Sequence, residues 1–456
     1  MTRGHDTEAG APAGKQRALL AAIVALIVAI SAAIYATAAS DDGTRDRTPL
    51  AGGRFPHHDA APAPASTGTW VGAWSTSPVG PEPGTATRGL AGRSVRNVVH
   101  AAVGGTGARI TLSNLYGRTP LTVTHASVAL AADDGTAAAV AASMRRLTFG
   151  GSPRVVVPAG GQVTSDVARI AVPHGGDVLI TTYSPLPSGP VTYHPQALQT
   201  SYVAEGDRTE DVTATAYTGR TSYWRYVTAL DVLSHEAVGT VVALGDSITD
   251  GAHSTMDANH RWPDILAQRL RAAAGAGRNV PRYSVVNQGI SSNRLLTHGP
   301  GTPPVNPSTL SRFPRDVLGR PNVKVVVVAI GVNDILHSPE LADRDAILTG
   351  LRTLVAMAHA HGLKVVGATV MPFGGYGGYT DARENMRQEI NEEIREGRIF
   401  DALVDFDAAL RDPYDPRRLR TEYDCGDHLH PNDRGYARMA TEVDLNALRN
   451  TTPALL

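Results

Sequence analysis

The chain has 456 residues, more than a single hydrophobic core usually holds, so its length predicts two folded units with appendages. Its 42 Lys and Arg residues balance 43 Asp and Glu residues, and this net charge of -1 argues against a nucleic-acid-binding protein. The only cysteine is Cys425, which excludes an intramolecular disulfide.

The first feature along the chain is an apolar segment. Residues 18–39 are 22 residues without a charge, with basic residues before them and acidic residues after them. At about 1.5 Å per residue, a helix of this length reaches roughly 33 Å, enough to cross a bilayer. The flanking charges place residues 1–17 in the cytoplasm and the rest of the chain outside. Ala36-Thr37-Ala38 resembles a signal-peptide cleavage site, but the apolar run exceeds the usual ~7–15 residues and favours an uncleaved membrane anchor.

Two regions of different composition follow. Residues 40–69 are rich in Ala, Pro, Gly, Thr and Asp, which predicts a disordered linker. Residues 70–236 contain short strand-like runs between Gly, Pro and Asp, a pattern typical of an antiparallel sandwich or jelly roll. The clearest runs are 94–103, 109–115, 121–124, 127–130, 154–157, 167–172 and 178–183. The aromatic cluster Tyr223–Tyr226 could form a platform for a sugar ring, or it could be an ordinary packed strand.

Residues 237–449 alternate apolar strands with helices, which predicts an α/β unit with a parallel sheet covered by helices on both faces. The expected strands are 241–244, 283–286, 323–330, 363–370 and 402–406, and the expected helices are 262–274, 341–361, 381–396 and 431–448. None of these strands leads into a Gly-rich phosphate-binding loop, so we expect no nucleotide cofactor, and no other cofactor is indicated.

Four short motifs lie at or beyond the ends of these elements. They are Gly245-Asp246-Ser247, Asn287-Gln288-Gly289-Ile290, Gly331-Val332-Asn333-Asp334 and Asp427-His428-Leu429-His430-Pro431. In this order they resemble the four blocks of the SGNH (GDSL-type) hydrolase superfamily, which supply a serine, a glycine, an asparagine and a histidine. Residues 70–77, 113–117 and 194–200 are similar to a two-domain bacterial branch of arylesterases and acylhydrolases grouped with xylan-degrading enzymes. The resemblance implies a three-layer α/β/α hydrolase domain behind a β-rich domain.

The chemistry of ester cleavage and the resemblance together suggest catalytic residues. Ser247 is the expected nucleophile and His430 the expected base, which needs a carboxylate to hold its ring. Asp424 precedes His428 by four residues and Asp427 precedes His430 by three, so two pairings are possible. The family pattern Asp-x-x-His-Pro favours Asp427 with His430.

The same resemblance implies an oxyanion hole and leaves room for a substrate rim. The expected donors are the backbone N–H groups of Ser247 and Gly289 and the side chain of Asn333. Tyr376 and Tyr379 stand in a stretch with four glycines after a predicted strand, where they could form a mobile rim that touches the substrate.

We expect no metal site near the histidine motif, because alternate residues such as His428 and His430 point apart in an extended segment. Asp246 and Asp334 are expected to be scaffold hydrogen-bond acceptors, and Cys425 a packing thiol.

The sequence therefore predicts a serine esterase that acts outside the cell membrane, either secreted or anchored on its outer face, and cleaves a small-molecule or carbohydrate ester. Two alternatives remain open. One is a lipase or phospholipase-type acylhydrolase with the same triad. The other is an envelope-binding protein whose hydrolase unit has decayed.

Overall fold

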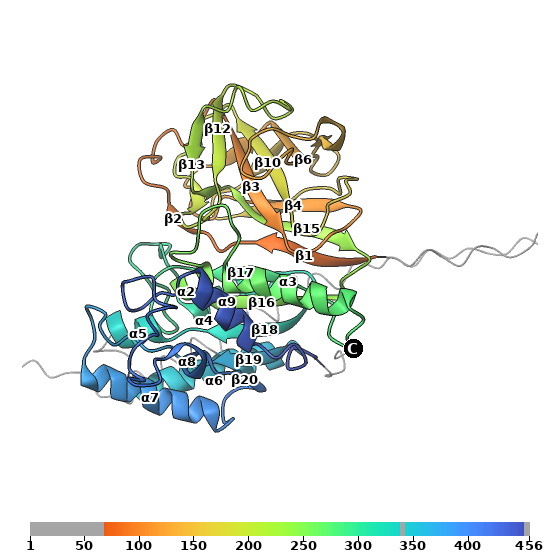
Figure 1. Cartoon of the computed structure of the whole chain (residues 1–456). Coiled ribbons are helices and arrows are strands. Elements are labelled where there is room, and N and C mark those ends of the chain that lie inside the picture. Colours follow the sequence, from red (N-terminus) through yellow and green to blue (C-terminus); the bar gives the residue numbers. More distant parts are fainter. Residues whose placement is uncertain (1–67, 338–342, 451–456) are drawn as a thin grey trace, which may run out of the picture. The chain divides into compact units, whose positions relative to one another are not determined.

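The computed structural model describes residues 68–337 and 343–450 of the chain (Figure 1). The predicted anchor or signal peptide (18–39) and almost all of the linker (40–69) lie outside the described residues. Within the part that is described, no helix combines the length and the apolar character needed to cross a bilayer.

The first half of the described chain is built from antiparallel strands. They form a four-stranded sheet in the order β1-β15-β4-β9 and a six-stranded sheet in the order β13-β12-β3-β10-β6-β7, with smaller sheets β14-β11-β2 and β5-β8. Buried side chains of both large sheets meet in one core, which is the predicted sandwich arrangement. The elements are β1 Thr69–Ser75, β2 Val79–Pro81, β3 Arg93–Ala101, β4 Ala108–Ser113, β5 Leu121–Val123, β6 His125–Leu130, η1 Ala141–Ser143, β7 Arg145–Arg146, β8 Val155–Val157, β9 Gln162–Thr164, β10 Gly176–Ser184, β11 Thr192–His194, β12 Ser201–Glu205, β13 Gly219–Thr221, β14 Trp224–Arg225 and β15 Val227–Ser234.

One predicted strand in this half is wrong, and the aromatic cluster is packed. Residues 167–172 make only isolated bridges, at Ala168 and Val172, because their neighbours Gly105 and Ala108 offer single contacts and no continuous ladder. Trp224 is buried, donates its ring N–H to Val98 O at 2.7 Å and packs edge-on against Trp74. The cluster is therefore an interior strand rather than an open platform for a sugar.

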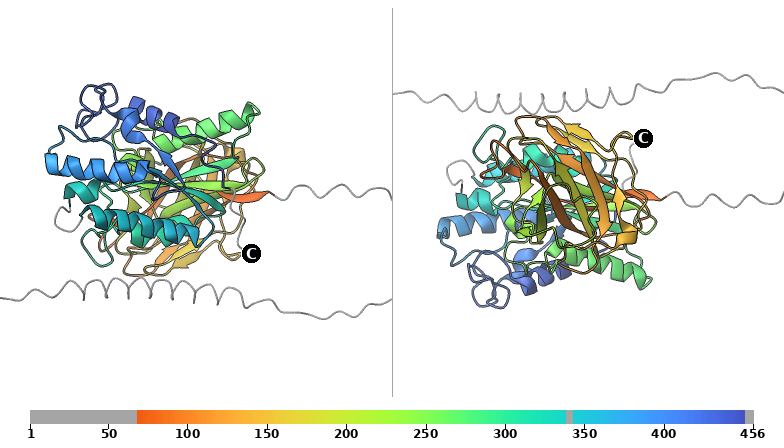
Figure 2. Two further views of the ribbon diagram at one scale, coloured as in Figure 1. Left: turned by 90° about the horizontal axis from the view of Figure 1, so that it is seen from below. Right: turned by 90° about the horizontal axis from the view of Figure 1, so that it is seen from above.

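The second half contains a five-stranded parallel sheet in the order β17-β16-β18-β19-β20. Helices cover both of its faces (Figure 2), as the strand–helix alternation predicts. The central strand residues Val325–Val328 are at most 1% exposed, which explains their continuous apolar run. The elements are β16 Gly239–Gly245, α2 Ser247–Asp250, α3 Trp262–Gly275, β17 Tyr283–Gly289, α4 Thr309–Phe313, η2 Pro314–Leu318, β18 Val323–Ala329, α5 Val332–His337, α6 Arg344–His359, β19 Lys364–Ala368, α7 Asp381–Arg395, β20 Ala402–Val404, α8 Phe406–Leu410 and α9 Asp433–Glu442.

The last helix is shorter than the predicted range 431–448. Asn432 caps its start by accepting a hydrogen bond from the Gly435 N–H. The helix ends at Glu442, and the following Asp444 accepts from the Asn446 N–H at 2.9 Å and closes a turn. The Asp side chain competes with helix continuation here, because it offers the backbone a local partner.

The two halves meet along β1 and β17. Gly72 in β1 donates its N–H to Thr240 Oγ1 at 3.2 Å and accepts at its carbonyl from Ser284 Oγ at 2.5 Å. A Cβ on Gly72 would stand 2.9 Å from a methyl carbon of Val286, so only glycine allows this close approach. The β-rich half therefore closes one edge of the parallel sheet.

Candidate active site

The site begins where β16 ends. A Cβ on Gly245 would lie 2.2 Å from Thr249 Oγ1 and 2.5 Å from Ala329 O, so the chain can turn sharply only at a glycine. Asp246 then caps α2, accepting a hydrogen bond from the Ile248 N–H at 3.0 Å. Ser247 is the first residue of α2, and its side chain is held just beyond the carboxyl end of β16.

Three predicted catalytic side chains are brought together in a line. Ser247 Oγ lies 2.8 Å from His430 Nε2, and His430 Nδ1 lies 2.6 Å from Asp427 Oδ2. The other oxygen of Asp427 accepts from the backbone N–H groups of Leu429 and His430. Burial raises the pKa of Asp427, but these hydrogen bonds from His430 and Leu429 outweigh it and hold the pKa well below its ordinary value. Asp427 is therefore a carboxylate that accepts the His430 ring N–H.

The alternative pairing is also present, but at the surface. His428 Nδ1 lies 2.7 Å from Asp424 Oδ2, and the other oxygen of Asp424 accepts from the backbone N–H groups of Gly426 and His428. His428 has a left-handed backbone (φ 69°) and its side chain is 46% exposed. The structure thus makes two separate carboxylate–imidazole pairs, and only the pair Asp427–His430 reaches Ser247.

The predicted oxyanion donors differ in what they offer. As the first residue of α2, Ser247 has a backbone N–H that needs no acceptor within the helix. Asn333 is buried at the start of α5 and uses one side-chain N–H on Asn293 O at 3.1 Å, which leaves its second N–H for a ligand.

Gly289 departs from the expectation. Its N–H donates to Asn287 Oδ1 at 2.8 Å, and its missing side chain makes room for the backbone of Asp250, 2.2 Å from where a Cβ would stand. Close packing of β17 against α2 is therefore the structural reason for glycine at this position, and its N–H is not directed to an oxyanion in this structure.

A buried arginine that the sequence did not single out ties the site together. Arg312 is 1% exposed and donates to Gly245 O at 2.8 Å, to Gln288 O at 2.7 Å and to Asn293 Oδ1 at 2.9 Å. It also pairs with Asp316, whose pKa is lowered to about 2 because Arg315 and Arg312 outweigh the effect of burial. Arg312 stands in the short helix α4, outside any recognisable motif, so only the folded chain reveals its role.

A second missed residue comes from the β-rich half. The His194 ring is 1% exposed at its side chain and lies between two acceptors, with Nδ1 2.8 Å from Ser77 O and Nε2 2.9 Å from Asp250 Oδ1. Because a carbonyl and a carboxylate can only accept, both ring nitrogens carry protons and the ring is an imidazolium. Asp250 also accepts from the N–H and Oγ of Ser291. His194 therefore fixes the end of α2, three residues after Ser247, from the other half of the molecule.

Replacing this ring should destabilise the fold in a pH-dependent way. Burial lowers the pKa of His194, but the raising effect of Asp250 is larger, so the pKa lies above its ordinary value of 6.5. The stability that this group contributes is therefore complete below pH 6.5 and is lost as the pH rises through the raised pKa.

We expect His194→Gln to lower the free energy of unfolding by about 3–5 kcal/mol at pH 6, measured in urea, and by less at high pH. His100→Gln, which alters the partly buried pair between His100 in β3 and Asp177 in β10, is the matched control. An equal cost at both pH values would contradict the charged ring.

Asp246 is also buried and titratable, but in the folded protein its neutral form is favoured. Burial, opposed by the hydrogen bond from Ile248 and reinforced by the charge of Asp334, raises its pKa to about 7. Since its ordinary value is 3.8, its contribution to stability is complete below pH 3.8 and falls as the pH rises towards 7. We expect Asp246→Asn to keep the cap. Between pH 4 and pH 8 its free energy of unfolding in urea should fall by about a few kcal/mol less than that of wild type. Parallel pH profiles for the two proteins would contradict the raised pKa.

The glycine-rich stretch lies beside the histidine motif. A Cβ on Gly375 would stand 3.1 Å from the His428 ring, and Gly374 donates its N–H to Arg417 O at 2.6 Å. Tyr376 and Tyr379 are half-buried and pack on the core of the second half, and Tyr379 donates its hydroxyl to Asp381 at 3.2 Å. The structure thus places this stretch at the edge of the site, and contact of the two tyrosines with a substrate remains a prediction.

Comparison with known proteins gives a matching family model and several similar solved structures. Residues 243–438 match the model of the GDSL-like Lipase/Acylhydrolase family. No curated protein matched the chain. Among solved structures, a member of the lipolytic protein G-D-S-L family from Veillonella parvula is 18% identical, with 45% of this chain and 96% of that chain covered and a TM-score of 0.33.

Two further neighbours are named for the esters that they cleave. A carbohydrate acetylesterase from Sinorhizobium meliloti is 16% identical over 44% of this chain and 95% of its own, with a TM-score of 0.34. An aryl esterase from M. smegmatis is 16% identical over 45% of this chain and 95% of its own, with a TM-score of 0.34. The matched family residues contain Ser247, His430 and the sheet that carries them. Residues 243–438 thus form a hydrolase domain of the GDSL-like Lipase/Acylhydrolase family, within the SGNH (GDSL-type) superfamily of carboxylic ester hydrolases.

Proposed function

We propose that the chain is a serine esterase that cleaves short acyl esters of carbohydrates or other small alcohols through an acyl-enzyme. The continuous hydrogen-bonded line from Ser247 Oγ through His430 to Asp427 is the observation that carries this proposal. A serine hydroxyl is a weak nucleophile by itself, and this arrangement gives it a base whose ring is held by a carboxylate.

The steps follow from these contacts. Ser247 Oγ attacks the ester carbonyl carbon while His430 Nε2 takes its proton, and Asp427 stabilises the imidazolium that forms. His430 returns the proton to the departing alcohol oxygen, which leaves an acyl group on Ser247. A water molecule then attacks the acyl carbon while His430 accepts its proton. His430 passes that proton to Ser247 Oγ as the acyl–oxygen bond breaks, which releases the carboxylic acid and restores the serine.

The charge on the tetrahedral oxygen needs fixed donors. We assign this task to the Ser247 backbone N–H and to the second side-chain N–H of Asn333. Gly289 contributes only if its N–H leaves Asn287 Oδ1, so its part in the proposed oxyanion hole is smaller than the sequence suggested.

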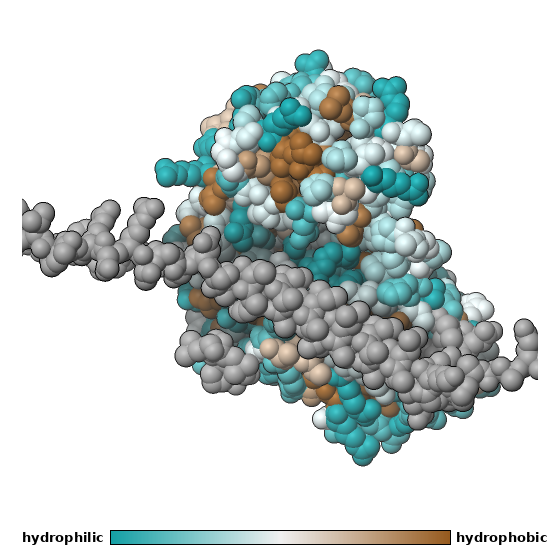
Figure 3. Space-filling model, turned by 180° about the vertical axis from the view of Figure 1, so that it is seen from behind, coloured by the Kyte–Doolittle hydropathy of each residue, from teal (hydrophilic) through white to brown (hydrophobic). Residues whose placement is uncertain are grey.

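The polar surroundings favour a hydrophilic alcohol over a lipid. The side chains of His253, His428 and Asp427 are 53%, 46% and 32% exposed beside the site. A lipase needs a contiguous apolar rim to meet a lipid surface. The face in Figure 3 is largely hydrophilic or neutral, with its most prominent apolar patch on the β-rich half. The large exposed apolar side chains of the described residues belong to separate segments: Val140, Val156, Val167, Leu186, Val238, Met256, Leu403 and Tyr414.

Rates on p-nitrophenyl esters of increasing chain length, followed by release of acetate from acetylated xylan, test the proposal. We expect fast acetate hydrolysis and negligible decanoate hydrolysis. Faster decanoate hydrolysis would favour the lipase alternative, and no hydrolysis of any ester would favour a decayed binding protein. Export across the membrane, predicted from residues 18–39, is tested separately by cell fractionation and by sequencing the mature N-terminus.

The same ester panel tests the rim. We expect the double variant Tyr376→Ala/Tyr379→Ala to change the ratio of acetate to butyrate rates severalfold, because both half-buried tyrosines belong to the stretch whose Gly375 lies against the His428 ring. Tyr414→Ala is the matched control, since Tyr414 is 96% exposed on another loop. Unchanged ratios in the double variant would show that the tyrosines do not meet the substrate.

A further inference from the structure

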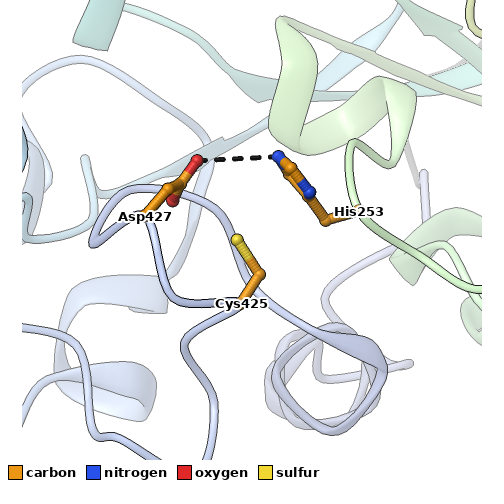
Figure 4. A group of neighbouring side chains, drawn as sticks. All are labelled: His253, Cys425 and Asp427. Carbon is orange, nitrogen blue, oxygen red and sulfur yellow. Dashed lines mark ion pairs between the residues drawn. The ribbon is translucent and has the colours of Figure 1, made fainter.

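Two side chains next to the triad lie close to its aspartate and form a group of three (Figure 4). The three are His253, in the segment after α2, and Cys425 and Asp427, in the loop before α9. Their ligand atoms all lie within 4.8 Å of one another, and His253 Nε2 is 3.6 Å from Asp427 Oδ2. Two ligands of a tetrahedral ion, bound at about 2.0–2.3 Å, stand roughly 3.3–3.7 Å apart. The separation of His253 and Asp427 suits such an ion, and Cys425 Sγ, within 4.8 Å of both ligand atoms, reaches it by a small shift.

The frame of this group is fixed although the group is open to solvent. Cys425 donates its N–H to His430 O at 3.0 Å, and Thr255, two residues after His253, donates its N–H to Asp433 at 2.9 Å. His253 holds a left-handed backbone (φ 66°), a conformation that disfavours side chains other than glycine. Its ring nevertheless stands over the site, 5.3 Å from the His430 ring between centroids. Strained residues of this kind concentrate at functional sites.

We propose that His253, Cys425 and Asp427 form a binding site for a thiophilic divalent cation of the Zn²⁺ class, and that the bound ion reversibly inhibits the enzyme. A histidine nitrogen, a cysteine sulfur and a carboxylate oxygen are the ligands that Zn²⁺ prefers, whereas Mg²⁺ and Ca²⁺ prefer oxygen alone. The thiol loses its proton to solvent as the metal–sulfur bond forms, and a water molecule completes the tetrahedron. This set differs from the His428 and His430 group, whose rings are already committed to separate aspartates.

Inhibition follows from the oxygen that is shared. Asp427 Oδ2 is the atom that accepts the His430 Nδ1–H, and its partner oxygen is already occupied by two backbone N–H groups. A divalent cation on Oδ2 weakens this hydrogen bond and places positive charge beside the ring. His430 then accepts the Ser247 proton less readily, so the chemical step slows. This regulatory consequence rests on the proposed function, whereas the binding of the ion does not.

Binding is tested without activity, on the full chain carrying Ser247→Ala. Titration with Co²⁺, a spectroscopic substitute for Zn²⁺, should give a thiolate-to-metal absorption band that Zn²⁺ abolishes. Adding Cys425→Ser should remove the band, and adding His253→Gln should weaken binding at least tenfold. His428→Gln, on the neighbouring exposed pair, is the matched control and should leave binding unchanged. Absence of the band, or its survival in Cys425→Ser, would overturn the site.

Regulation is tested on the active enzyme with p-nitrophenyl acetate. Zn²⁺ should lower kcat at least tenfold with little change in KM, and a chelator should restore it. In Cys425→Ser and His253→Gln the inhibiting concentration should rise at least tenfold, while His428→Gln should stay as sensitive as wild type. Equal sensitivity of all variants would show that Zn²⁺ acts on His430 directly and would overturn the regulatory role. An enzyme without esterase activity that still binds Co²⁺ would refute the proposed function and leave the metal site standing.

Discussion

Ser247→Ala is expected to reduce ester hydrolysis by roughly 10⁴- to 10⁶-fold, because the substitution removes the hydroxyl oxygen that His430 Nε2 activates for attack on the substrate. His430→Ala should lose a similar amount. The double variant should be no worse than either single variant, since a nucleophile and its base act as a unit. Steady-state rates on p-nitrophenyl acetate measure all three.

The fold must survive for this result to be informative. Within the described residues, the Ser247 hydroxyl makes its hydrogen bond to His430. Its loss should therefore leave the core unchanged, so circular dichroism and the unfolding midpoint should match wild type. Normal hydrolysis by Ser247→Ala would refute the serine-esterase mechanism. Additive losses in the double variant would show that Ser247 and His430 act independently.

The second large effect separates the two aspartates of the histidine motif. Asp427→Ala should lower kcat by roughly 10⁴-fold, because the His430 ring loses the carboxylate that fixes its tautomer and stabilises its charged form. Asp424→Ala should keep most of the activity, since Asp424 bonds to His428, which does not reach Ser247. Rates of both variants on the same ester decide between them.

These two variants are matched in chemistry and in location. Each removes one carboxylate that accepts a histidine ring N–H and two backbone N–H groups in the same loop. Loss of loop structure alone would therefore damage both enzymes alike. An inactive Asp424→Ala beside an active Asp427→Ala would mean that the catalytic pairing is the reverse of the one proposed.

Much of the fold was predictable because the relevant signals are local. The run Val325–Val328 is apolar on every residue, as a strand covered on both faces requires, and its place in the sheet follows from the alternation with helices. Helix 262–274 was predicted within one residue of α3 because its apolar positions recur at helical spacing. Strand 167–172 failed, since a short alternating run needs a partner ladder that the sequence does not reveal.

The site was predictable where a motif carried it and hidden where a distant contact did. Ser247, Asp427 and His430 stand in recognisable blocks, and the structure places them in contact. Arg312 and His194 were missed because their importance comes from carbonyl and carboxylate acceptors far away in sequence. For Gly289 the structure adds a reason that the motif does not show, because the backbone of Asp250 lies where a side chain would stand. Its role as an oxyanion donor stays a prediction.

The contact of His194 with Asp250 has a consequence for any change to either half. His194 of the β-rich half supplies a proton and a positive charge, and Asp250 of the other half supplies the carboxylate, with both side chains buried. Replacing the β-rich half by an unrelated sandwich would leave Asp250, the last residue of α2, as a buried charge without its partner. We therefore expect a change on one side of this contact to lower stability unless a complementary change on the other side restores the pair.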